Sequence, residues 1–141
     1  MSHLAHVCIA WGWSTMVIGI LSGSFLGMFA FAGPFPAPKG WEDYSSLTRR
    51  MVRLAHIAFV MLPIITILYG NHIDGAVLSD ELKTIGCYLM IFGMFGVPIL
   101  LILSAVVWHP FKYLEALPVT GIVMGLCIMA YGYAGPLLLG P

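Results

Sequence analysis

The chain has 141 residues, of which 60% are hydrophobic and 9% are charged, and its formal net charge is zero. Soluble domains carry about 25% charged residues, so a soluble fold of this size could not cover its surface with so few charges. The charge balance gives no reason to expect nucleic-acid binding. The composition therefore predicts an integral membrane protein, with residues 1–141 forming a single domain.

Four stretches are long and apolar enough to cross a bilayer, which takes about 20 residues of helix. The predicted spans are residues 4–31, 51–70, 84–108 and 117–139. The links between the spans are short, so neighbouring helices should run antiparallel. The predicted fold class is all-α, an antiparallel bundle of four transmembrane helices.

Three polar links join the predicted spans: residues 32–48, 71–83 and 109–116. The first link has three prolines and two glycines, which rule out a helix there. Ser45 or Ser46 can cap the second helix, and Ser79 can cap the third.

The basic residues divide unevenly between the two ends of such a bundle. The end opposite the termini carries Lys39, Arg49, Arg50, Arg53 and Lys112, whereas the terminal end carries only Lys83. Because Lys and Arg accumulate in cytoplasmic loops, we expect both termini on the non-cytoplasmic side of a bacterial inner (plasma) membrane.

The three cysteines, Cys8, Cys87 and Cys127, all fall in apolar stretches, and no CxxC or CxxCH motif occurs. A disulfide framework, a thiolate zinc site and a c-type haem attachment are therefore not expected. We expect each cysteine to behave as a small buried hydrophobic residue.

The first span contains the series Gly19, Gly23 and Gly27 on one helix face. Small residues at this spacing let helices in lipid approach closely. The sequence leaves open whether this face packs within the chain or against another subunit.

Arg53 and His56 lie three residues apart in the second span, on one helix face. Ionisable groups inside a membrane are costly and often functional. One interpretation is that His56 ligates the iron of a haem b while Arg53 pairs with a propionate. The alternative is that His56 hydrogen-bonds a neighbouring helix and Arg53 ends the basic cluster.

A second group of imidazoles is expected at the terminal end. His3, His6 and His72, with Asp74, could bind copper or zinc, or they could be solvated interface residues. His6 could instead ligate a haem lying high in the bundle. A six-coordinate haem on His56 would then need a methionine or a partner chain for its second ligand.

Catalytic signatures do not occur in the sequence. It has no nucleophile–base pair or phosphate loop, and no Asp or Glu lies inside a predicted span. The missing acidic residues weaken a proton-pump or cation-coupled transporter hypothesis. We expect a chain that is not catalytic by itself.

Residues 9–70 contain GILSGSFLGMFAF and then YSSLTRRMVRLAHIAFVMLPIITILYG. This half of the chain resembles the first two helices of haem–copper oxidase catalytic subunits. In that family a glycine-rich helix precedes an aromatic residue with arginines and a haem-ligating histidine, positions matched here by Tyr44, Arg49, Arg50 and His56. Four spans cannot supply the family's copper ligands, so the resemblance implies a small relative or look-alike in a respiratory membrane complex.

Together these patterns predict a small, mainly structural membrane subunit of a respiratory or electron-transfer complex. Its expected partners are other integral membrane subunits and lipid, with haem b or a bordering quinone site as candidate cofactor chemistry. The alternative is a homo-oligomeric small transporter or channel.

Overall fold

Four long helices make up most of the computed structural model, which describes residues 1–29, 33–38, 41 and 43–139. They are α1 (His3–Met28), α2 (Leu47–His72), α3 (Asp80–Val106) and α5 (Ala116–Leu139). A 3₁₀ turn, η1 (Ile73–Gly75), follows α2, and a one-turn helix, α4 (Phe111–Leu114), precedes α5. These ranges contain no strand, so the all-α prediction is confirmed for the part of the chain described.

Each long helix is apolar and long enough to cross a membrane. α2 and α3 each begin about one turn before the predicted spans, because the serine caps set their starts. Ser46 accepts a hydrogen bond from the Arg49 amide and Ser79 accepts one from the Leu82 amide. The predicted end of the first span at Phe31, and Lys39 in the first link, lie outside the described residues.

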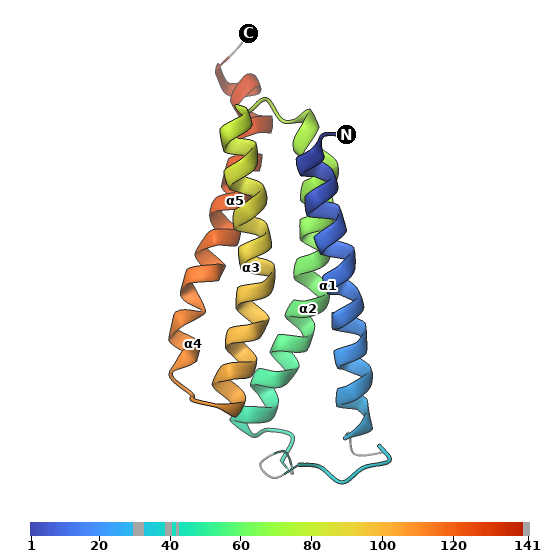
Figure 1. Cartoon of the computed structure of the whole chain (residues 1–141). Coiled ribbons are helices and arrows are strands. Elements are labelled where there is room, and N and C mark those ends of the chain that lie inside the picture. Colours follow the sequence, from blue (N-terminus) through green and yellow to red (C-terminus); the bar gives the residue numbers. More distant parts are fainter. Residues whose placement is uncertain (30–32, 39–40, 42, 140–141) are drawn as a thin grey trace.

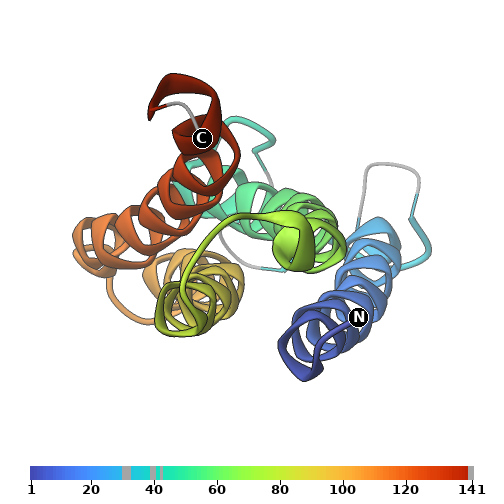
Figure 2. The ribbon, with the colours of Figure 1, turned by 90° about the horizontal axis from the view of Figure 1, so that it is seen from above.

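The helices pack in chain order, α1 on α2, α2 on α3 and α3 on α5, with a smaller contact between α1 and α3. Both termini lie at one end of the molecule, at the top of Figure 1. Seen from above, α2 and α3 lie between the two outer helices α1 and α5 (Figure 2). α3 is accordingly the most buried span and α5 the least.

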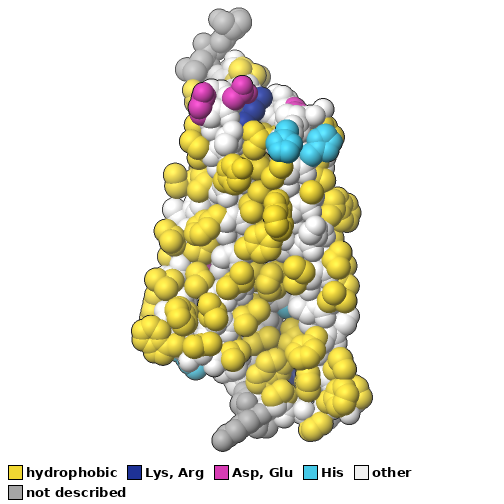
Figure 3. Space-filling model, in the orientation of Figure 1, with side chains coloured by type: hydrophobic (Ala, Val, Ile, Leu, Met, Phe, Trp, Pro, Cys, Tyr) yellow, Lys and Arg dark blue, Asp and Glu magenta, His cyan; other side chains and the backbone are white. Residues whose placement is uncertain are grey.

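The exposed surface of the four long helices is largely hydrophobic. On the face shown in Figure 3, hydrophobic side chains run along the length of the helices, and acidic, basic and histidine side chains are visible at the end that carries the termini. Of the described basic residues, Arg49, Arg50, Arg53 and Lys112 lie towards the opposite end. Large side chains such as Val17, Leu21 and Phe25 on α1 are more than half exposed. In water this surface would be costly, so the four apolar helices indicate a membrane protein.

Part of the α1 glycine series packs inside the chain. A Cβ added at Gly19 would collide with the Phe59 carbonyl of α2, and one added at Gly23 would lie 2.5 Å from Cε1 of His56. A Cβ at Gly27 would meet nothing within 4 Å. The sequence left open whether this glycine face packs within the chain or against another subunit. Gly19 and Gly23 pack within the chain, where they let α1 approach α2.

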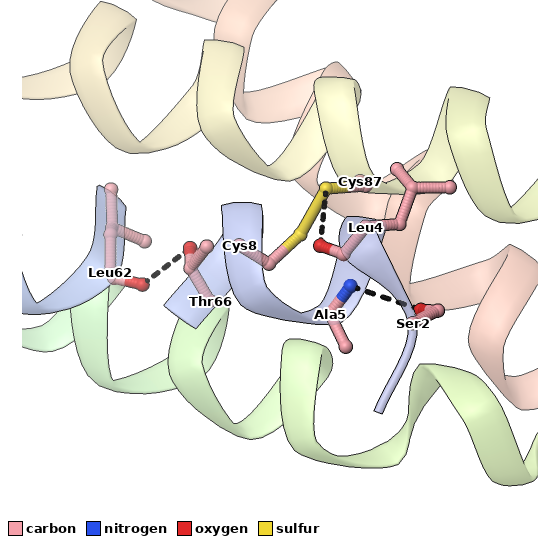
Figure 4. Close-up of a disulfide and its surroundings, with 7 residues drawn as sticks. All are labelled: Ser2, Leu4, Ala5, Cys8, Leu62, Thr66 and Cys87. Carbon is pink, nitrogen blue, oxygen red and sulfur yellow. Dashed lines mark hydrogen bonds between the residues drawn. A yellow bond between two sulfur atoms is a disulfide. The ribbon is translucent and has the colours of Figure 1, made fainter. Parts of the chain in front are cut away.

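A disulfide joins Cys8 of α1 to Cys87 of α3, with the two Cα atoms 6.2 Å apart (Figure 4). Both residues are fully buried, as expected, but the expectation that they are unbonded was wrong. The bond links residues 79 apart, and spacing alone cannot show that two helices meet. Cys127 is exposed, so its predicted burial was also wrong.

Candidate functional site

His56 lies on α2 about 13.5 Å along the helix axis from Leu47, at 1.5 Å per residue. Its imidazole packs against α1, where Gly23 leaves room for the ring. Nδ1 of His56 is 3.0 Å from Oγ of Ser22. A glycine and a serine one position apart on α1 thus hold this side chain in one place.

The hydrogen bonds of Ser22 assign the proton on this imidazole. The Ser22 hydroxyl donates to the Gly19 carbonyl at 2.7 Å, so it can only accept from His56 Nδ1. In the neutral imidazole this arrangement puts the proton on Nδ1 and leaves the lone pair on Nε2. No described residue hydrogen-bonds Nε2. Metal-ligating histidines are oriented in the same way, through a hydrogen bond from the other ring nitrogen.

Two adjoining cavities, each of about 220 Å³, share His56, and we call them together the His56 pocket. Leu26, Trp41 and Val52 also line both cavities. One cavity is otherwise almost entirely apolar, lined by Ser22, Phe25, Phe59, Ile102 and Val106. The other is basic at its rim, lined by Gly27, Phe29, Tyr44, Arg49 and Arg53. The pocket therefore pairs an apolar chamber with a cationic opening.

The basic rim is organised around Tyr44. The guanidinium carbons of Arg53 and Arg49 lie 3.9 Å and 5.1 Å from the centre of the Tyr44 ring. Arg49 Nη1 also donates to the Trp41 carbonyl at 2.8 Å. Neither arginine forms an ion pair with a described residue, so the rim can accept an anionic group.

Asp43, an exposed carboxylate in the segment before α2, is held by hydrogen bonds within its own turn. Asp43 accepts hydrogen bonds from the hydroxyl and the amide of Ser45. These bonds, and to a smaller extent the charge of Arg49, lower the pKa of Asp43 below its ordinary value. Asp43 is therefore part of the turn that precedes α2, and it forms no ion pair with Arg49 or Arg53.

The histidines predicted at the terminal end are engaged locally. Nδ1 of His6 pairs with the Ser2 carbonyl at 2.9 Å, and Nδ1 of His72 pairs with the Leu68 carbonyl at 2.8 Å. Asp74 accepts from the Ser2 amide at 2.6 Å and lies 3.7 Å from the N-terminal amine. Among the described residues, no three His, Cys, Asp or Glu side chains gather as a metal site would require. The copper or zinc hypothesis for His3, His6 and His72 stays a prediction.

His6 and His56 lie towards opposite ends of the bundle. Ser22, which contacts His56, is about 24 Å along α1 from His6 at 1.5 Å per residue. One iron cannot bind both histidines. Among the described residues, no other histidine and no methionine lines the His56 pocket. A second axial ligand from the described part of the chain would have to come from outside these cavities.

The position of Glu115 differs from what the sequence predicts. It lies between α4 and α5, within the membrane-span candidate Phe111–Leu137. The fourth candidate begins at Phe111 and not at residue 117, because much of the link 109–116 is helical. The expectation that no acidic residue lies inside the membrane stays a prediction. A helical interpretation of residues 111–114 would have placed Glu115 next to the fourth long helix.

No protein-family model matches the chain, and neither does any curated protein or solved structure.

Proposed function

We propose that the chain is a small membrane subunit of an electron-transfer complex, where it braces larger subunits and holds one edge of a haem b in the His56 pocket. The observation that carries this proposal is that His56, whose Nε2 has no hydrogen-bond partner among the described residues, lines a cavity that Arg49 and Arg53 also line. The alternative, that His56 only bridges two helices, accounts for the contact of Nδ1 but gives Nε2 no partner.

The chemistry of the lining residues fits a b-type haem. Such a group needs an imidazole ligand and no covalent thioether, and it would supply one-electron transfer when bound. His56 would ligate through Nε2, Ser22 would hold the ring orientation, and Arg53 with Arg49 would bind the acidic edge.

Each cavity is smaller than a usual cofactor pocket, so a haem would need a further wall from a partner subunit. Cofactor pockets usually measure about 300–1,000 Å³, and each of these two cavities measures about 220 Å³. The remaining wall would come from a neighbouring membrane subunit, for which the exposed apolar face of α1 offers a contact surface.

The proposed setting is a bacterial inner membrane, with the four long helices crossing it as an antiparallel bundle and both termini on the non-cytoplasmic side. The basic residues near the His56 pocket support this orientation through the positive-inside rule. The Cys8–Cys87 disulfide at the opposite end supports it independently, because disulfides persist on the oxidising side of a membrane.

The rival function, a homo-oligomeric transporter or channel, would use the glycine face of α1 between copies. Gly19 and Gly23 already pack on α2, so the structure offers no specific observation in its favour.

The proposal is tested by isolating the chain with its partners from native membranes and recording a reduced-minus-oxidised spectrum. We expect co-purifying integral membrane subunits and a b-type signal. A chain that purifies alone and without haem from mild detergent would contradict both parts of the proposal.

A further inference from the structure

The His56 pocket opens sideways between α1 and α3. Its apolar chamber, of about 220 Å³, is lined by Phe25 of α1 and Val106 of α3, among others. Phe25 is 57% exposed and Val106 is 69% exposed. α1 and α3 contact each other less than either contacts α2, so a hydrocarbon chain can enter the chamber from the surrounding bilayer.

The basic rim of the pocket lies where a lipid headgroup would lie. Arg49 and Arg53 belong to the first two turns of α2, which begins at Leu47, and Trp41 and Tyr44 precede that helix. Aromatic residues gather at the membrane interface, and arginine side chains near a helix end reach it. The pocket therefore combines an apolar chamber inside the bilayer with a cationic opening at its surface, which is the polarity of an anionic amphiphile.

The two arginines of the rim have no counter-ion among the described residues. Their guanidinium carbons both face the Tyr44 ring, 3.9 Å and 5.1 Å from its centre, so two like charges share one small site. Like charges at close range raise each other's electrostatic free energy, and an anion between them removes that cost. A phosphate can accept two parallel hydrogen bonds from a guanidinium, so a phosphate diester is a suitable complement.

We propose that the His56 pocket of the haem-free chain binds an anionic phospholipid from the bilayer, with the phosphate between Arg49 and Arg53 and part of one acyl chain in the apolar chamber. Basic pockets between helices at the cytoplasmic side of a membrane bind such headgroups. The inference goes beyond the proposed function, because it concerns the chain before a haem occupies the pocket. Lipid and haem would be alternative occupants, since both need the same two arginines.

The charges of the pocket favour an anionic phospholipid over other membrane molecules. A zwitterionic lipid such as phosphatidylcholine carries a quaternary ammonium beside its phosphate, and the two arginines repel that group. Free inorganic phosphate could neutralise the arginines but would leave the apolar chamber unfilled. Phosphatidylglycerol has a phosphate without a neighbouring cation and two acyl chains, so it matches both parts of the pocket.

The test titrates the full chain, purified without haem in a neutral detergent, with phosphatidylglycerol or phosphatidylcholine and counts bound lipids by native mass spectrometry. We expect saturable binding of phosphatidylglycerol that is at least about tenfold tighter than that of phosphatidylcholine. Inorganic phosphate in large excess should not displace the lipid, because it occupies the rim alone. Displacement by phosphate, or equal affinity for the two lipids, would overturn the inference.

Substitution of the two rim arginines tests the headgroup contact. Arg49→Gln with Arg53→Gln should weaken phosphatidylglycerol binding by about thirtyfold, because each basic residue near an anionic headgroup contributes about fivefold. The control, Arg50→Gln with Lys112→Gln, removes the same charge from residues outside the pocket and should leave the affinity nearly unchanged. Equal losses in the two double variants would show a nonspecific attraction to positive charge and would contradict the site.

Val106 and Val107 provide a matched pair for the acyl chain. They are adjacent at the end of α3 and are 69% and 66% exposed, and of the two only Val106 lines the chamber. Val106→Trp should weaken phosphatidylglycerol binding at least about tenfold, since each methylene group excluded from the chamber costs about fourfold. If Val106→Trp binds the lipid as tightly as Val107→Trp, the acyl chain does not enter the chamber and the inference is wrong.

These outcomes are independent of the haem proposal, because the chain is tested without haem and without partner subunits. Selective binding of phosphatidylglycerol by a chain whose native complex contains no haem would support the lipid site and contradict the haem proposal. A haem-containing native complex whose haem-free chain shows no lipid selectivity would do the reverse.

Discussion

At the scale of single residues, the environment of His56 is set by what α1 lacks. Gly23 has no side chain, and the imidazole occupies the space that a methyl group would take. The sequence showed that His56 and Arg53 share a helix face, and the structure brings both to one pocket. The sequence could not show that Ser22, 34 positions from His56, fixes the tautomer of the His56 imidazole. That contact depends on how α1 and α2 meet.

Gly23→Ala should destabilise the protein, because the added methyl would lie 2.5 Å from Cε1 of His56 and 2.9 Å from Nε2. Overpacking of this kind costs about 1–3 kcal/mol. The matched control is Gly27→Ala, where the methyl meets nothing within 4 Å. Equal unfolding midpoints for the two variants in detergent would show that the ring does not rest on Gly23.

Thr15→Val should be neutral or stabilising, because the Thr15 hydroxyl is fully buried with no hydrogen-bond partner among the described residues. Removing an unsatisfied buried hydroxyl relieves a penalty of about 1–3 kcal/mol. Thr66→Val is the matched control, since the Thr66 hydroxyl donates to the Leu62 carbonyl at 2.9 Å. The account predicts that Thr66→Val lowers the unfolding midpoint and Thr15→Val does not; the opposite order would refute it.

At the scale of helices, the apolar stretches and the serine caps predicted all four long elements. Ser46 and Ser79 begin α2 and α3 as their capping chemistry requires. Two features escaped prediction for different reasons. The Cys8–Cys87 bond depends on α1 meeting α3. The fourth candidate span includes Glu115 because the chain is already helical from Phe111, directly after Pro110.

Replacing both Cys8 and Cys87 by Ala should lower the free energy of unfolding by about 2–4 kcal/mol, since the bond closes a long stretch of chain. The outer helix α1 would lose its covalent link to α3. Thermal unfolding with and without reductant checks this, and reductant should destabilise the wild type but not the double variant. Maleimide labelling of the native protein at all three cysteines would contradict the bond; only Cys127 should react.

At the scale of the whole molecule, the basic rim and the disulfide lie towards opposite ends of the bundle. A Cys127→Ser background allows the orientation to be read directly. Val77→Cys, at an exposed position near η1, should react with a membrane-impermeant maleimide from outside intact cells, and Ser45→Cys should not. The reverse labelling pattern would invert the proposed orientation.

The central claim is that Nε2 of His56 ligates haem iron. The most direct test is the haem-to-protein ratio of the complex purified with His56→Ala, beside the same ratio for His109→Ala. His109 is exposed and lies outside the His56 pocket. We predict that His56→Ala removes the haem assigned to this chain while the complex still assembles, and that His109→Ala retains it. An unchanged ratio in an assembled His56→Ala complex would contradict the account.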